Sequence, residues 1–269
     1  MRPQRIGGSG AAVANSGGRS TTASFARRAS QGRFMDVTCI IATKNAEKHL
    51  PEALQSIRAQ PGVEVDVIVV DGASTDRTRE IAQSYGARVA KEDGPGLSHA
   101  WNTGIRLAKA PLIGFLDSDD IWVADTLADR VRTLEAAAAA VSIGRVRHFL
   151  DQADPSPGGF KRILQAGIEQ LAPIPGAMLV RRSVFDEIGA FDPRYVLAAD
   201  VDWLGRLINA AVATMEFARL VLLKRLHSAN LTGQIDLVHR DLLAALRQKL
   251  VNDRRTRASK VPPARQGGA

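Results

Sequence analysis

Short apolar runs alternate with amphipathic segments along the chain from residue 37 onward. Runs rich in Val, Ile and Leu predict buried strands, and apolar residues three or four positions apart predict helices between them. The predicted strands are 37–43, 65–70, 87–90 and 112–116, and the predicted helices are 47–59, 76–85 and 97–108. This alternation indicates an α/β fold with a mostly parallel central sheet flanked by helices on both faces.

The pattern becomes less regular after residue 120, and no internal repeat is visible. The predicted helices of this part are 123–139, 183–188, 201–209 and an amphipathic closing helix, 235–251. The predicted strands are 141–150, 173–180, 214–217 and 220–225, with a loop rich in Pro, Gly and Asp over 151–159. Ser183 is expected to cap the short helix that it opens.

Basic residues concentrate at the two ends of the chain. Residues 1–34 hold six arginines and residues 254–269 hold five basic residues, and neither segment holds an acid. The rest has 25 basic and 28 acidic residues, so the formal net charge of +8 comes from the ends. Nothing marks the folded part as a nucleic-acid surface. We interpret both ends as disordered, solvated extensions, with peripheral contact to an anionic membrane as the alternative.

Targeting signals are weak. The apolar stretch 204–226 is interrupted by five charged residues, so it does not predict a membrane span. The N-terminal composition resembles a transit peptide, but a disordered extension, or a start codon placed before the real start at Met35, suits it better. The single cysteine, Cys39, lies in an apolar strand and is compatible with a reducing compartment. We expect a cytoplasmic protein.

The acidic run Asp117-Ser118-Asp119-Asp120 follows the predicted strand 112–116 directly. A strand that ends in a loop delivers side chains to the carboxyl edge of the sheet, where open α/β folds bind ligands. Three carboxylates in four residues repel one another unless a cation is present, which favours a metal–diphosphate site. The alternative is that Asp119 or Asp120 caps a helix beginning near residue 121. Neither a Gly-x-Gly-x-x-Gly motif nor a P-loop is present.

Four segments, in one order, resemble the family 2 glycosyltransferases of the GT-A fold. They are 38–45 (TCIIATKN), 69–76 (VVDGASTD), 94–105 (GPGLSHAWNTGI) and 115–120 (FLDSDD). The resemblance extends over about residues 36–232. It implies a domain over 35–232, with a Rossmann-like nucleotide-binding half (35–120) joined to an acceptor half (121–232). The amphipathic pattern adds a C-terminal helix, 233–253, before the basic tail 254–269.

The resemblance also implies a nucleoside-diphosphate sugar as donor. Asp71 would bind the base and ribose, Thr43 and Glu47 would line the base pocket, and Asp117 would lie on the ribose side. Two alternatives come from the residues themselves: Asp71 as a turn carboxylate, and Glu47 as an acid at a helix N-terminus.

Two residues would hold the metal by the same resemblance. Asp119 would coordinate Mg²⁺ or Mn²⁺ between the two phosphates, and His227, in the late segment 225–232 (RLHSANLT), would close over the phosphates together with Arg225. The alternative for His227 is a structural role, and Asp120 is expected to be the helix cap.

A sugar hydroxyl is a poor nucleophile and needs a base within hydrogen-bond reach. Segment 198–207 (AADVDWLGRL) resembles the family's Glu-Asp-x-Asp-Leu-x-x-Arg stretch, which assigns Asp200 as catalytic base. Ala199 replaces the expected Glu, which puts the acceptor type in doubt. The alternative is that Asp200 caps the helix 201–209.

Three further residues are candidates for the site. By analogy Gly176 would lie at the floor where donor sugar and acceptor meet, although an ordinary turn also explains a glycine there. Trp101 and Trp203 suit stacking on a sugar ring, but core packing is the preferred interpretation.

The sequence therefore predicts an inverting, metal-assisted glycosyltransferase of cell-envelope or polysaccharide biosynthesis. Its acceptor would be a saccharide, a lipid-linked molecule or a small molecule with a hydroxyl group. The alternatives are a non-catalytic sugar-nucleotide binding protein, which Ala199 keeps open, and a sugar nucleotidyltransferase. The latter should have a Gly-rich, basic loop after the first strand, and Ala42-Thr43-Lys44-Asn45-Ala46 is not such a loop.

Overall fold

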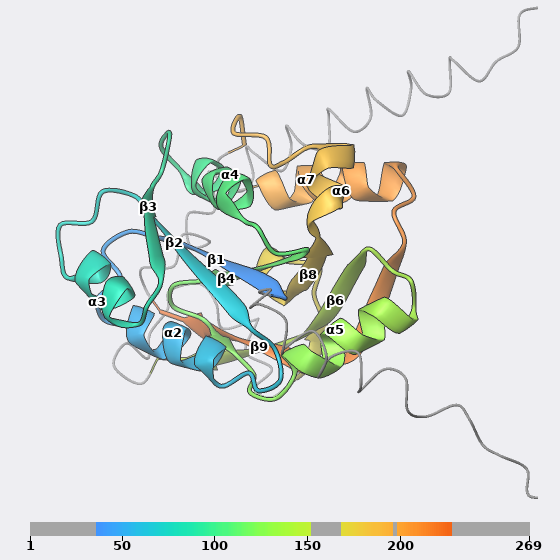
Figure 1. Cartoon of the computed structure of the whole chain (residues 1–269), viewed down its shortest axis with the longest axis horizontal. Coiled ribbons are helices and arrows are strands. Elements are labelled where there is room, and N and C mark those ends of the chain that lie inside the picture. The colour runs from blue at the N-terminus through green and yellow to red at the C-terminus, as the bar shows by residue number, and fades with distance from the viewer. Residues whose placement is uncertain (1–35, 152–167, 196–197, 228–269) are drawn as a thin grey trace, which may run out of the picture. The chain divides into compact units, whose positions relative to one another are not determined.

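The computed structural model describes residues 36–151, 168–195 and 198–227, all within one compact unit, Met35–Ala269. The described strands form a single nine-stranded sheet with helices on both faces (Figure 1). Both basic ends, the predicted helix 235–251 and most of the predicted loop 151–159 lie outside the described residues. The predicted domain limits therefore stay predictions.

The first half contains the predicted strands and helices with shifts of a few residues at their ends. The strands are β1 (Val37–Thr43), β2 (Val65–Asp71), β3 (Arg88–Lys91) and β4 (Leu112–Asp117). The helices are α2 (Leu50–Arg58), α3 (Thr78–Ser84) and α4 (Leu97–Leu107). The strands pair in the order β3-β2-β1-β4, all parallel, as the sequence predicts for a nucleotide-binding half.

The second half extends the same sheet from β4 in the order β8-β6-β9-β5, with β7 beside β6. Its strands are β5 (Ile121–Trp122), β6 (Val141–Leu150), β7 (Gln170–Leu171), β8 (Met178–Arg181) and β9 (Thr214–Leu226). Its helices are α5 (Leu127–Ala136), the 3₁₀ turn η2 (Pro175–Ala177), α6 (Arg182–Ile188) and α7 (Ala199–Asn209). β6 and β9 are parallel, while β8, β5 and β7 pair antiparallel with their neighbours. The predicted α/β class is confirmed.

Two predictions about the second half were wrong. Residues 121–122 form a strand paired with β9 rather than the start of a helix, and α5 begins only after Thr126. Strand pairing is favoured over a helix start here because it buries Trp122, which is 4% exposed. The two strands predicted at 214–217 and 220–225 are one strand, β9, whose pairing with β6 shifts register between Ile143 and Val146.

The predicted cap of the short helix was also wrong. Arg181 occupies the N-cap position of α6, and no side chain makes a capping hydrogen bond there. Ser183 therefore lies inside the first turn of this helix.

The helices cover the sheet in two groups. Helices α2, α3 and α5 lie on one side, and α4, α6 and α7 lie on the other (Figure 1). The core under the second group contains an aromatic cluster of Trp101, Phe115, Phe185, Phe191 and Trp203, with neighbouring ring centroids 4.8–6.1 Å apart. Trp101 and Trp203 are 5% and 0% exposed, so the preferred interpretation of both as core residues is confirmed.

Helix α4 connects the two halves of the chain. Asn102 donates from Nδ2 to the Phe191 carbonyl (2.7 Å) and accepts from the Phe191 amide (3.0 Å). The Ser98 hydroxyl donates to the carbonyl of Tyr195 at 3.1 Å. These bonds hold the segment that leads into α7 against the nucleotide half, so the two helices keep a fixed relation.

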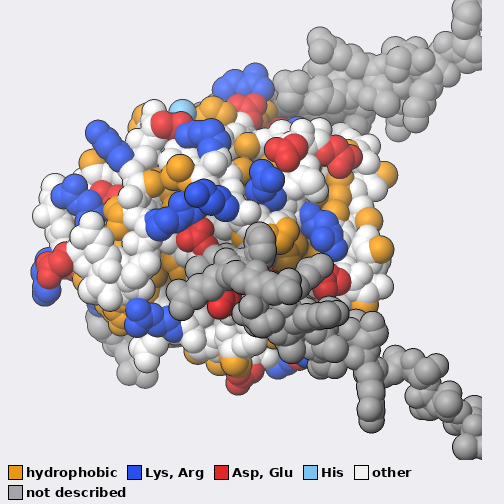
Figure 2. Space-filling model, viewed as in Figure 1, with side chains coloured by type: hydrophobic (Ala, Val, Ile, Leu, Met, Phe, Trp, Pro, Cys, Tyr) orange, Lys and Arg blue, Asp and Glu red, His pale blue; other side chains and the backbone are white. Residues whose placement is uncertain are grey.

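The surface in Figure 2 mixes acidic and basic side chains on the visible face instead of gathering basic ones in one patch. Within the described ranges, no helix combines the length and the apolar character needed to span a bilayer.

Candidate active site

Three predicted site residues stand at the carboxyl ends of neighbouring parallel strands. Thr43 ends β1, Asp71 ends β2 opposite Thr43, and Asp117 ends β4 opposite Ala42. β1 is the strand at which the sheet order reverses, because β2 and β4 lie on its two sides. Ligands of open α/β sheets bind at such a reversal point, outside the carboxyl ends of the strands. The topology therefore brings these predicted residues to one edge.

Asp71 is buried, and its carboxylate accepts hydrogen bonds from the Ser74 amide at 3.2 and 3.3 Å. Arg79 Nε lies 3.8 Å from its Oδ2. The turn geometry named as the alternative for Asp71 is thus present. It orients the carboxylate, which leaves base recognition by Asp71 a prediction.

Thr43 and Glu47 differ in their surroundings. The Thr43 side chain is buried, and its Oγ1 has no hydrogen-bond partner among the described residues. Glu47 is exposed and accepts a hydrogen bond from the Arg77 amide at 3.1 Å. Helix α2 begins at Leu50, so the predicted place of Glu47 in a first helical turn was wrong. Glu47 instead joins the loop after β1 to the loop after β2.

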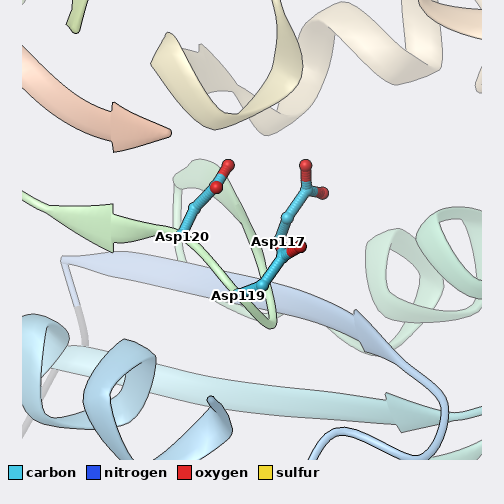
Figure 3. Close-up of side chains that lie close together, drawn as sticks. All are labelled: Asp117, Asp119 and Asp120. Atoms are coloured by element: carbon cyan, nitrogen blue, oxygen red, sulfur yellow. The ribbon is translucent and has the colours of Figure 1, made fainter. Parts of the chain in front are cut away.

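Asp117 is the last residue of β4, and Asp119 and Asp120 lie in the loop that follows; the side chains of Asp117 and Asp120 point the same way (Figure 3). One carboxylate oxygen of each lies within 4.8 Å of the others. Asp120 is not a helix cap, contrary to the prediction, because α5 starts later. Its Oδ1 accepts from the Arg225 amide and its Oδ2 from Lys224 Nζ, each at 2.9 Å.

Lys224 is a site residue that the sequence reasoning missed. Its Nζ lies 2.9 Å from Asp120 Oδ2 and 2.9 Å from Asp117 Oδ2. The repulsion that had suggested a metal is therefore offset in part by the protein's own ammonium. Lys224 is more than a hundred positions away from the acids in the chain, and only the pairing of β9 with β5 brings it to them.

Burial and the opposing charges shift the pKa values of this group. Burial raises the pKa of Asp120 to about 7; Lys224 opposes the shift, while Asp117 and Asp119 add to it. Burial works to lower the pKa of Lys224, but the carboxylates of Asp117 and Asp120 outweigh it, and the pKa is raised. The lysine stays charged over the whole physiological range.

Asp119 and His227, the two predicted metal ligands, lie together. His227 Nε2 is 2.8 Å from Asp119 Oδ2, and the His227 ring stacks on His49 with centroids 5.3 Å apart. Arg225 Nε donates to the Asp119 carbonyl at 2.9 Å, and its guanidinium pairs with Glu52. Arg225 thus holds the loop in place. The set of carboxylate oxygens with one imidazole suits a hard or borderline divalent ion such as Mg²⁺ or Mn²⁺.

Asp200 lies in the first turn of α7. The N-cap is Ala198, so the alternative that Asp200 caps this helix was wrong; its Oδ1 accepts from the Val201 amide at 2.9 Å. Burial raises the pKa of Asp200, Asp117 raises it further, and Lys224 lowers it. The charges of Asp117 and Lys224 therefore act on Asp200, as they would in a shared site.

Helix α7 is held by Arg206, four residues after Asp202. Arg206 Nε donates to Asp202 Oδ2 at 3.0 Å, and its other nitrogens donate to the carbonyls of Ile188, Gly189 and Ala190. Four hydrogen-bonded groups on one guanidinium fix the orientation of the helix that carries Asp200.

Gly176 is buried against β9, where an added Cβ would lie 2.9 Å from Leu222 Cδ2. Leu222 and Lys224 are two positions apart in β9, so their side chains point to the same face of the strand. Gly176, which contacts Leu222, therefore lies on the face from which Lys224 reaches the acidic cluster. Its carbonyl accepts from Trp122 Nε1 at 3.3 Å. Ala199, at the position expected to hold Glu, is 3% exposed and belongs to the core.

A family model described as Glycosyl transferase family 2 matches residues 38–189. The chain is 25% identical over 179 residues to an uncharacterized glycosyltransferase of Nostoc sp., covering 59% of this chain and 55% of that protein. It is 31% identical over 132 residues to the succinoglycan biosynthesis protein ExoU of Rhizobium meliloti, covering 42% and 38%. The chain thus spans about half, or less, of the length of these curated relatives.

Two solved structures share the fold. The mannosyltransferase PcManGT of Pyrobaculum calidifontis, in complex with GDP-Man and Mn²⁺, has a TM-score of 0.60 at 20% identity, covering 85% of this chain and 71% of that one. S. aureus TarS 1-349, in complex with UDP-GlcNAc, also has a TM-score of 0.60 at 20% identity, covering 74% and 61%. The family match covers more than half of the chain, the fold agrees with it, and the chain belongs to glycosyl transferase family 2, with a GT-A fold.

Proposed function

We propose that this protein is an inverting glycosyltransferase that moves a sugar from a nucleoside-diphosphate sugar to a hydroxyl acceptor. The observation that carries the proposal is that Thr43, Asp71 and the three acids of the cluster meet at one edge of the sheet, and the charge of Asp117 also acts on Asp200. An acid that can remove a proton and a group that can stabilise a departing diphosphate are then available in one site.

The donor is proposed to lie at the edge formed by β1, β2 and β4. Thr43 offers a buried hydroxyl with no partner among the described residues, which a ligand would satisfy. Asp71 is oriented by its turn to accept hydrogen bonds from a base and ribose. Asp117 ends β4, and Glu47 lies in the loop that follows β1. The bound sugar nucleotides named for both solved structures are consistent with this class of donor.

The metal is proposed to be held by Asp119 and His227, whose ligand atoms already lie 2.8 Å apart. When bound, Mg²⁺ or Mn²⁺ offsets the charge that builds on the departing nucleoside diphosphate. The Mn²⁺ complex of PcManGT supports a divalent ion without deciding between the two metals.

Asp200 is proposed to take the proton of the acceptor hydroxyl as it attacks the anomeric carbon from the face opposite the diphosphate. A single displacement of this kind inverts the anomeric configuration. The raised pKa of Asp200 strengthens it as a base. Gly176 is proposed to lie at the floor where donor sugar and acceptor meet. The space beside its Cα is taken by Leu222, which an added Cβ would approach to 2.9 Å.

The acceptor is proposed to be a saccharide, a lipid-linked molecule or a small molecule with a free hydroxyl. The role of ExoU in succinoglycan biosynthesis supports polysaccharide or cell-envelope biosynthesis. A cytoplasmic site of action and peripheral membrane contact through the basic ends stay predictions.

The non-catalytic sugar-nucleotide binding protein is the second candidate, because the core position of Ala199 removes the acid that the family pattern places beside the base. The test is release of nucleoside diphosphate from UDP- and GDP-sugars with Mn²⁺, by the parent protein and by Asp200→Asn. We expect release by the parent and a loss of at least a hundredfold in the variant. Equal rates in the two proteins would remove Asp200 as base, and no release from any donor would favour the binding protein.

A further inference from the structure

Lys224 extends from β9 to the acidic cluster and lies between two of its three carboxylates. Its Nζ is 2.9 Å from both Asp117 Oδ2 and Asp120 Oδ2. The Lys224 side chain is 19% exposed and that of Asp120 is 1% exposed, so water screens this pair little. An ammonium in this position does for Asp117 and Asp120 what a bound cation would do.

Asp119 is arranged differently. Its Oδ2 lies 2.8 Å from His227 Nε2, and its carbonyl accepts from Arg225. The cluster is thus divided: two carboxylates face a lysine near the end of β9, and the third faces the histidine that follows that strand. Without Lys224, one oxygen from each of the three acids, all within 4.8 Å, would offer a divalent ion several competing positions.

We propose that Lys224 is a built-in cation that occupies Asp117 and Asp120 and thereby reserves divalent-metal binding for Asp119 and His227. Because the ammonium also lowers the negative charge of the site, metal alone binds weakly, and tight binding requires the diphosphate of the donor. Metal and donor therefore enter together. This inference rests on the proposed function, since it assigns Lys224 as a positioning residue for the same site.

The charge of Lys224 also affects residues outside the acidic cluster. It lowers the pKa of Asp200, against the effects of burial and of Asp117. The register of β6 and β9 places His148 opposite Lys224, and the pKa of His148 is lowered, first by burial and then by this lysine. The charge of Lys224 thus acts on Asp200 and His148 as well as on the two acids that hold it.

The test is a titration with Mn²⁺ alone, followed by the electron paramagnetic resonance signal of the free ion. We expect Lys224→Met to bind Mn²⁺ at least about tenfold more tightly than the parent, since even in water a unit charge about 5 Å from a divalent ion changes the affinity by this factor. Lys224→Arg, which keeps the charge, should bind like the parent. Lys109→Met is the control, because Lys109 is exposed and precedes the amino end of β4, whereas the acidic cluster follows its carboxyl end.

Unchanged or weaker Mn²⁺ binding by Lys224→Met would overturn the assignment. So would a loss of UDP affinity with unchanged Mn²⁺ affinity, because Lys224 would then be a phosphate ligand. If Lys224→Met is unfolded, Mn²⁺ should refold it by binding the native state, and a variant that stays unfolded at saturating Mn²⁺ contradicts the proposal. A failure of the proposed function is separate: it appears as no diphosphate release by the parent, whatever the titration shows.

Discussion

Gly104 lies in the middle of α4, where this helix packs on β1. An added Cβ would lie 2.3 Å from Cγ2 of Ile40, 2.9 Å from Cγ1 and 3.0 Å from Cδ1. Ile40 is fully buried in a central strand and branched at Cβ, so it has little freedom to move away. The Gly104→Ala variant therefore tests how closely α4 approaches the sheet.

Two opposing terms set the expected effect. Overpacking of a tight core lowers the free energy of unfolding by up to about 3 kcal/mol, and replacing a glycine inside a helix by alanine raises it by about 1 kcal/mol. We expect Gly104→Ala to lower the free energy of unfolding by about 2 kcal/mol, or to lower Tm by roughly 4–8 °C for a domain of this size. Gly205, in α7, is the matched control because an added Cβ there meets nothing within 4 Å. Gly205→Ala should raise stability by about 0.5–1 kcal/mol.

Urea unfolding followed by circular dichroism measures both changes. A double-mutant cycle with Ile40→Ala should show a coupling of at least about 1 kcal/mol, because the alanine removes all three contacting atoms. The reasoning is refuted if Gly104→Ala is as stable as the parent, or if the two glycine variants shift stability in the same direction.

Three further outcomes are expected. The pKa of Asp200 is raised above its ordinary value of 3.8, and the base must be ionised, so kcat/KM should fall with falling pH at a midpoint above 3.8. Asp117→Asn removes a charge that raises this pKa, so it should move the midpoint to lower pH. A midpoint that does not move contradicts the coupling between the two acids. Asn102→Ala removes the side chain that bonds the amide and carbonyl of Phe191, and it should lower the free energy of unfolding in urea by about 1–3 kcal/mol. An unchanged free energy of unfolding would contradict the role of Asn102 in joining the two halves. Arg206→Met should lower the free energy of unfolding by about 2 kcal/mol. It should also lower kcat by a larger factor than it raises KM for the donor, because it releases the helix that carries the base. Equal factors in kcat and KM would indicate only general destabilisation.

The first half of the fold could be predicted because local patterns determine it. Each parallel strand is a continuous apolar run and each helix between them is amphipathic, so β1 to β4 were located within a few residues. The strand at 121–122 could not be predicted, because two residues carry no periodicity and only pairing with β9, about a hundred residues later, makes them a strand. The capping roles of Asp120 and Asp200 failed for the same reason: both depended on where helices begin, which is the least certain part of a sequence pattern.

The candidate site could be located from the polar and acidic residues at the ends of predicted strands. The balance of charges within the site could not be predicted. The three acids suggested a cation, but no sequence pattern indicates that Lys224 supplies one, since it lies in an apolar strand where a lysine ordinarily points to solvent. The pairing of Asp119 with His227 agreed with the resemblance, whereas Glu52 and His49 around them were not anticipated. Contacts between residues far apart in the chain are set by the packing of the whole sheet, which no local pattern records.

The central claim is that Asp119 and His227 hold a divalent ion that binds together with a nucleoside diphosphate. The most direct measurement is the thermal midpoint of the protein with UDP or GDP, with and without Mn²⁺, for the parent, Asp119→Ala and the control Asp125→Asn, an exposed acid later in the chain. We predict a rise in midpoint that requires both nucleotide and metal in the parent and the control and is absent in Asp119→Ala. A rise without Mn²⁺, or an equal rise in Asp119→Ala, would contradict it.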